Sequence, residues 1–127
     1  MPQYRRYYGG SWVFLTLVTY NRRPIFLHED ARRLLRMAMN QTKHDRPWQT
    51  EAIVLLPDHI HMMWRLPEQD LNYSPRVGAL KKRFSRALLR SGGISEIVTI
   101  GQKRHRRQGV WQPRFWEHTI RDEKDYR

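Results

Sequence analysis

The stretch from residue 48 to residue 66 constrains the fold more than any other part of the chain. It holds two short apolar runs, WQTEAIVLL (48–56) and HIHMMWRL (59–66), which are separated by Pro57 and Asp58. Short apolar runs bounded by turn formers are typical of strands, and a Pro-Asp pair favours a turn between them. The sequence therefore predicts two strands that pair as an antiparallel hairpin.

The other predicted elements surround this hairpin in a recognisable order. β-branched and aromatic residues dominate two segments, and apolar residues recur at helical spacing in two others. These elements are a strand at 11–19, a helix at 29–43, a helix with Ser74 as N-cap that runs to Arg90, a strand within 111–120 after Pro113, and a third helix starting near Asp122. The residues predicted to face the core of these helices are Ala31, Leu34, Leu35 and Ala38 in the first and Val77, Leu80, Phe84, Ala87 and Leu88 in the second. The order β-α-β-β-α-β predicts an α+β, ferredoxin-like split β-α-β fold, with an antiparallel sheet and its helices on one face. We expect residues 1–127 to form a single domain.

The charge of the chain is strongly positive and narrows the class of partner. Lys and Arg total 24 against 12 Asp and Glu, which gives a formal net charge of +12. Such an excess indicates a polyanion, usually a nucleic acid, and the preference for Arg over Lys favours phosphate and base contacts. A basic bias without function and an anionic membrane surface are the alternatives.

Two absences exclude further classes of protein. The sequence has no Cys, so disulfides, thiolate metal sites and a cysteine nucleophile are excluded. Every apolar run is far shorter than the roughly 20 residues that a membrane-spanning helix needs. A cytoplasmic protein without a membrane partner is the expectation.

His59 and His61 are the residues that most clearly suggest chemistry. Residues two apart on a strand point to the same side, so the two imidazoles share one face with Met63 and Arg65. Ile60, Met62 and Trp64 then take the other face, which is the natural core side. Two neighbouring imidazoles can supply two ligands of a divalent ion, with a third, oxygen-bearing ligand from elsewhere. Mg²⁺ or Mn²⁺ suits such a site, with Zn²⁺ as an alternative, and the competing interpretation is a pair of half-buried, hydrogen-bonded structural histidines.

Four segments of the chain resemble one family of transposases. LLPDHIHMMWRLPEQD is similar to the HUH segment (His, bulky hydrophobe, His) of single-tyrosine transposases. YRRYYGGSWVFLTLVTYNRRPIF resembles the first strand region of their REP-associated tyrosine transposase branch, and LKKRFSRALL resembles its second helix. VWQPRFWEHTIRDEKDYR resembles the segment that leads into the catalytic helix of that branch. The resemblance covers nearly the whole chain and identifies it as a member of the HUH endonucleases.

The resemblance implies a metal-dependent enzyme that nicks single-stranded DNA carrying hairpins, in the bacterial cytoplasm with the nucleoid. A tyrosine attacks the phosphodiester and leaves a 5′-phosphotyrosine and a free 3′-hydroxyl, while His59 and His61 match the metal-binding pair. In the family the nucleophilic tyrosine lies past the position of Arg127, and an Asn or Gln ligand follows one helical turn later. Tyr126 matches an earlier KDY position and is a weak substitute. The resemblance thus predicts a C-terminally truncated chain that binds DNA without cutting it and holds its metal weakly.

Basic residues in several segments are candidate DNA contacts. Some are interleaved with aromatic residues, a pattern useful on single strands, and others form a stripe along the second helix or a Gly-bounded loop. The candidates are Arg5, Arg6, Arg22, Arg23, Lys82, Arg86, Arg104, Arg106, Arg107 and Arg114. The alternative for each is an ordinary solvated side chain, and His118 is predicted to be structural.

Two rival functions fit parts of the same pattern. The first is a non-catalytic single-stranded nucleic-acid-binding module on the same fold, because this fold hosts many functions. The second is a histidine-triad nucleotide hydrolase, although Met63 stands where that motif has its third histidine. We expect no small-molecule cofactor, and either a monomer or a homodimer.

Overall fold

The computed structural model describes residues 12–91, 110–112 and 116–120 of the chain. Its strands are β1 (Trp12–Val18), β2 (Gln49–Leu56), β3 (His59–Arg65) and β4 (Trp116–Ile120). Its helices are α2 (Glu29–Asp45) and α3 (Tyr73–Ser91), with short 3₁₀ turns η1 (Tyr20–Arg22) and η2 (Ile25–Leu27) after β1. Strands and helices thus follow one another in the predicted order.

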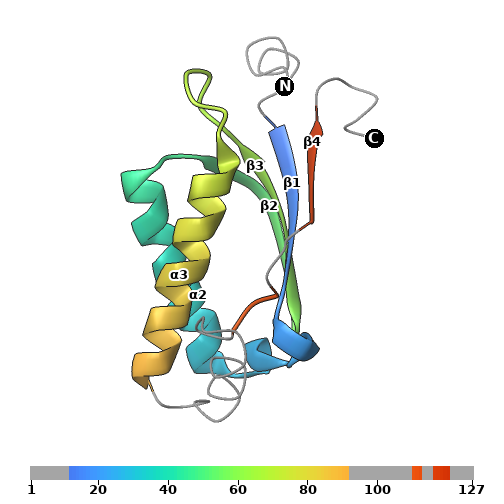
Figure 1. Cartoon of the computed structure of the whole chain (residues 1–127), viewed down its shortest axis with the longest axis vertical. Helices are drawn as coiled ribbons and strands as arrows, with labels where there is room; N and C mark the ends of the chain where they lie inside the picture. Colours follow the sequence, from blue (N-terminus) through green and yellow to red (C-terminus); the bar gives the residue numbers. More distant parts are fainter. Residues whose placement is uncertain (1–11, 92–109, 113–115, 121–127) are drawn as a thin grey trace.

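The strands form one antiparallel sheet in the order β2-β3-β1-β4. β3 lies between β1 and β2 and is antiparallel to both, so β1 and β2 run in the same direction and α2 connects them across β3. The outer strand β4 is antiparallel to β1. Both helices lie on the same side of the sheet (Figure 1). The predicted α+β, ferredoxin-like fold with helices on one face is confirmed.

Burial alternates along β3 and shows which face of the sheet is the core. Ile60, Met62 and Trp64 are fully buried, whereas the residues between them are half-buried. Leu15 and Leu17 of β1 lie opposite Met62 and Ile60 in the register and are also buried. The helices cover this face with apolar residues that the helical period predicted: Ala31, Leu34, Leu35, Ala38, Val77, Leu80, Phe84 and Leu88. Ala87, which was predicted with them, is half-buried and packs against this core. His59, His61, Met63 and Arg65, which alternate with the buried residues along β3, lie on the other face of the sheet.

Several predicted boundaries shift by one to a few residues. α2 extends to Asp45 instead of ending at residue 43. α3 begins at Tyr73, ahead of the predicted N-cap at Ser74, because Asp70 accepts a hydrogen bond from the Asn72 N–H (3.1 Å) and turns the chain earlier. The strand predicted within 111–120 is described from Trp116 onward. Trp111 instead makes an isolated bridge with Thr19, and the helix predicted near residue 122 lies outside the described residues.

Arg76 is a buried charge that joins α3 to the segment before β2. Its side chain is 3% exposed and contacts Asp70 at 3.3 Å. Nε donates to the Pro47 carbonyl (3.0 Å) and Nη1 to the Asn72 carbonyl (2.7 Å). A buried guanidinium must keep such partners, because an unpaired buried polar group is costly.

Replacing Arg76 with alanine is expected to lower the free energy of unfolding by about 2–4 kcal/mol, because the Pro47 and Asn72 carbonyls lose the donor they share and a small void opens where the buried side chain was. Urea unfolding followed by circular dichroism measures this loss. Arg33→Ala is the matched control, since Arg33 is exposed and its pair with Asp30 spans one helical turn; its effect should stay within about 0.5 kcal/mol. Equal losses in the two variants would contradict the structural role of Arg76.

Candidate metal and DNA-binding site

His59 and His61 lie side by side on the face of β3 that points away from the helices. Their ring centroids are 4.8 Å apart and the rings meet edge to face, at 85°. The arrangement follows from the strand itself, because residues two apart share a face. Their neighbours Ile60 and Met62 bury on the opposite face against the helical layer. The predicted juxtaposition of the two imidazoles is therefore present and is accessible from one side of the sheet.

Each imidazole is held through its Nδ1 atom. His59 Nδ1 lies 2.7 Å from Asp58 Oδ1, and His61 Nδ1 lies 3.0 Å from Thr16 Oγ1. An ionised carboxylate can only accept, so His59 donates its Nδ1–H and carries its lone pair on Nε2. The hydroxyl of Thr16 can donate or accept, so it orients His61 without fixing the tautomer. Nε2 is thus the atom that each ring can offer to a metal ion.

Asp58 links the histidines to the turn after β1. Arg22 Nε donates to Asp58 Oδ2 at 2.9 Å. The hydrogen bond from His59 lowers the pKa of Asp58 most, and the hydrogen bond from Arg22 lowers it further. The carboxyl group is therefore ionised at neutral pH. The sequence interpretation treated Asp58 only as a turn residue, although a carboxylate next to a metal-binding histidine is a recurrent outer-shell partner and could have been sought.

Apolar side chains flank His61 on the same face. The ring of Phe14 stacks on His61, with centroids 5.7 Å apart and planes 11° from parallel, and Phe14 is 39% exposed. Val54 of β2 lies opposite His61 in the register and is also exposed. An exposed aromatic ring beside two imidazoles offers a surface on which an unpaired base could stack. Nothing in the sequence pattern singled out Phe14, because its contact with His61 arises from the pairing of β1 with β3.

The described part of the chain brings together His59 and His61, the two residues that the sequence predicts as metal ligands. Among the described residues, no three His, Cys, Asp or Glu side chains lie close enough together to hold a metal ion. Asp58 contacts the Nδ1 atom of His59 and is therefore placed to orient this ring. A third ligand, as the sequence resemblance implies, has to come from residues other than these.

The candidate DNA contacts divide between the two sides of the sheet. Arg22 lies beside the histidines, 61% exposed. Arg23 is half-buried, and its carbonyl accepts a hydrogen bond from Thr19 Oγ1 (2.8 Å). Lys82 and Arg86 are exposed on α3, in the layer on the other side of the sheet. Arg5, Arg6, Arg104, Arg106, Arg107, Arg114 and Tyr126 lie outside the described residues.

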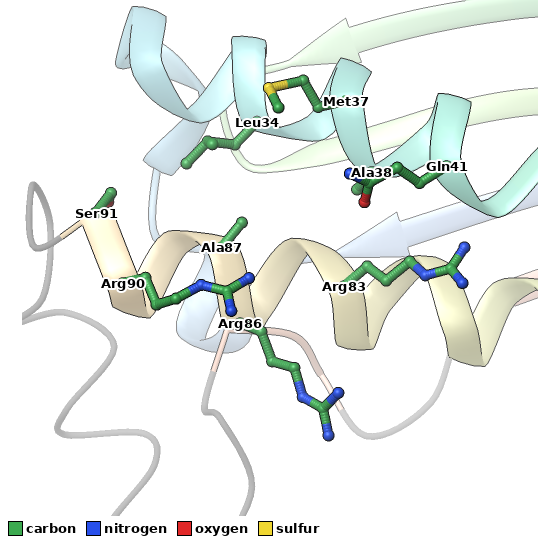
Figure 2. A pocket seen from close by; sticks show the side chains of 9 residues that line it. All are labelled: Leu34, Met37, Ala38, Gln41, Arg83, Arg86, Ala87, Arg90 and Ser91. Atoms are coloured by element: carbon green, nitrogen blue, oxygen red, sulfur yellow. The ribbon is translucent and has the colours of Figure 1, made fainter.

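A basic groove runs between α2 and α3, on the helical side of the molecule. Leu34 and Met37 of α2 line it on one side. Arg83, Arg86 and Arg90 of α3 line it on the other (Figure 2). Arg83 forms an ion pair with Asp45, whereas Arg86 belongs to the stripe predicted from the sequence. The groove and the paired histidines are thus on opposite sides of the sheet and do not form one site.

The fold and the paired imidazoles define an HUH-type domain, and comparison with known proteins gives its family. A family model described as "Transposase IS200 like" matches residues 10–125. The chain belongs to this family of transposases. The family match leaves the alternative of a histidine-triad hydrolase without support.

The relatives within this family are REP-associated tyrosine transposases. The chain is 43% identical to the REP-associated tyrosine transposase of Escherichia coli K12, over 100% of this chain and 67% of that protein. It is 40% identical to a Haemophilus influenzae protein named "Putative REP-associated tyrosine transposase", over 98% of this chain and 69% of that protein. A solved structure of a REP-associated tyrosine transposase bound to a REP hairpin matches with a TM-score of 0.71 and 39% identity, over 99% of this chain and 66% of that chain.

The matched region spans about two thirds of the length of these relatives. The predicted resemblance to REP-associated tyrosine transposases is confirmed by both the sequence and the fold. Among the described residues, no helix is long and apolar enough to cross a membrane.

Proposed function

We propose that this chain is the metal- and DNA-binding part of an enzyme that nicks and rejoins single-stranded DNA next to hairpins. The observation that carries the proposal is the pair of imidazoles on one open face of β3, 4.8 Å apart and each held through Nδ1. The family of the chain and a relative bound to a REP hairpin support it. Such an enzyme would act on the nucleoid in the bacterial cytoplasm.

The donor atoms of the site fit a divalent cation. Two Nε2 atoms on a rigid strand, with oxygen ligands completing the shell, suit Mn²⁺ or Mg²⁺. Once bound, such an ion offsets the charge that develops on the scissile phosphate. His59 and His61 would hold the ion, and Asp58 and Thr16 would orient them through Nδ1.

The remaining chemistry belongs to a tyrosine and to the DNA itself. The tyrosine oxygen attacks the phosphorus, the bond from phosphorus to the 3′-oxygen breaks, and the products are a 5′-phosphotyrosine and a free 3′-hydroxyl. The resemblance puts this tyrosine past Arg127, with Tyr126 as the weaker candidate. Phe14 offers a stacking surface next to the cut site, and the basic residues, including Lys82 and Arg86 on the helical layer, supply affinity for phosphates.

The test is the formation of a covalent protein–DNA adduct. We incubate hairpin DNA and Mn²⁺ with the 127-residue chain and with a chimera that continues it with the corresponding C-terminal segment of the Escherichia coli relative. The chain is expected to bind the hairpin without forming an adduct, because the family resemblance matches the nucleophilic tyrosine to a position past Arg127. The chimera is expected to form an adduct that His61→Ala abolishes, since the phosphate then lacks its metal.

Two outcomes separate the proposal from its rivals. An adduct formed by the 127-residue chain and lost in Tyr126→Phe would make Tyr126 the nucleophile. Hairpin binding with no adduct in the chimera, at any Mn²⁺ concentration, would favour the non-catalytic binding module.

A further inference from the structure

Asp58 is the junction of the hairpin turn with the end of β1. Its carboxylate contacts His59 through Oδ1 and Arg22 through Oδ2. Its backbone carbonyl accepts a hydrogen bond from the Thr19 N–H (3.0 Å), and the Thr19 hydroxyl, which donates to the Arg23 carbonyl at 2.8 Å, lies 3.1 Å from the same Asp58 oxygen. Thr19 is fully buried, so the backbone of the turn is fixed against the core. The orientation of the Asp58 side chain depends on its two side-chain partners.

The turn that carries Arg22 has an unusual backbone. Asn21 and Arg22 both have positive φ angles, 53° and 52°. Asn adopts this left-handed region fairly often, whereas a long side chain such as Arg rarely does. Strained residues persist where the surrounding structure holds them and cluster at functional sites. Here the left-handed turn reverses the chain after β1 and places the guanidinium of Arg22 against Asp58.

We propose that Arg22 is a positioning residue of the metal site, which acts through Asp58 on His59. Arg22 Nε donates to Oδ2 of Asp58, so that Oδ1 faces the Nδ1–H of His59. The lone pair of His59 then lies on Nε2, the atom that would hold an ion. Without Arg22 the carboxylate, which is 23% exposed, can rotate into water, and the imidazole can then change tautomer or flip. This inference rests on the proposed metal site and gives Arg22 a different role from the phosphate contact predicted from the sequence.

The decisive variant is Arg22→Gly, because glycine adopts positive φ angles without penalty and keeps the turn. The control is Arg33→Gln, which removes one exposed positive charge from α2 on the helical side. Imidazole ¹⁵N shifts of the metal-free chain report the tautomer of His59, calorimetry gives the Mn²⁺ affinity, and thermal unfolding reports structural damage.

In Arg22→Gly we expect the ¹⁵N shifts of His59 to move away from the Nδ1–H form. Mn²⁺ affinity should fall about 10-fold, the lower end of the usual cost of an outer-shell change. The thermal midpoint should change by less than about 4 °C. Arg33→Gln should leave all three readouts as they are in the parent chain.

Unchanged His59 ¹⁵N shifts in Arg22→Gly would overturn the proposal. If the shifts are unchanged and the same variant binds the hairpin more weakly, Arg22 is a phosphate contact instead. If the parent chain binds no Mn²⁺, the proposed metal site fails. The ¹⁵N shifts of the metal-free chain still decide whether Arg22 orients His59.

Discussion

His61→Ala is expected to abolish measurable Mn²⁺ binding to this chain. The variant removes one of the two imidazoles of the proposed site, and the remaining imidazole of His59 is a single weak ligand. The loss should exceed the 10- to 100-fold weakening that follows the loss of an outer-shell partner. Isothermal titration calorimetry with Mn²⁺ measures it, and circular dichroism confirms that the variant is folded.

His44→Ala provides the matched control for this experiment. His44 is an exposed residue in the last turn of α2. This helix packs on the side of the sheet opposite the paired imidazoles. Its removal tests whether any surface histidine binds Mn²⁺ nonspecifically. If the two variants weaken Mn²⁺ binding equally, the pair on β3 is not the metal site.

Affinity for a DNA hairpin with a single-stranded 5′ flank should fall steeply with salt. Each phosphate contact by Arg or Lys releases bound cations, so the logarithm of affinity falls linearly with the logarithm of the salt concentration. Four to six contacts on a single strand predict a loss of roughly 50- to 300-fold between about 50 and about 200 mM salt. Fluorescence anisotropy with a labelled hairpin measures the slope.

Two variants separate charge from stacking in this measurement. Arg86→Gln should reduce the slope by about 0.7 if Arg86 contacts a phosphate. Phe14→Ala should weaken binding at every salt concentration without changing the slope, because base stacking releases no cations. Equal affinity for the hairpin and for plain duplex at physiological salt would indicate nonspecific attraction to a chain of net charge +12.

The elements and their buried faces were predictable because they depend on local periodicity. Alternation on β3 follows from a repeat of two residues, and this repeat alone placed His59 and His61 together and opposite Ile60. The helical repeat likewise identified Leu35 and Phe84 as core residues. Boundaries such as the start of α3 were less predictable, because the side chain of Asp70 turns the chain before the helix.

The environment of the histidines was decided by contacts between distant segments. The β1–β3 register brings Thr16 to His61 and leaves Phe14 stacked on the same ring. No local pattern encodes a pairing between residues 45 positions apart. The histidine pair could therefore be identified from the sequence, and Asp58 could have been sought beside it, but the contacts of Thr16 and Phe14 with His61 could not be foreseen.

The sequence by itself determined the order of the elements, the shared face of His59 and His61, and the family resemblance, because each depends on short-range spacing or on matched segments. The tertiary structure alone decided that Arg22 reaches Asp58, since this contact needs a left-handed turn after β1. It also decided that Thr16 and Phe14 contact His61, because the β1–β3 register pairs segments that lie far apart in the sequence.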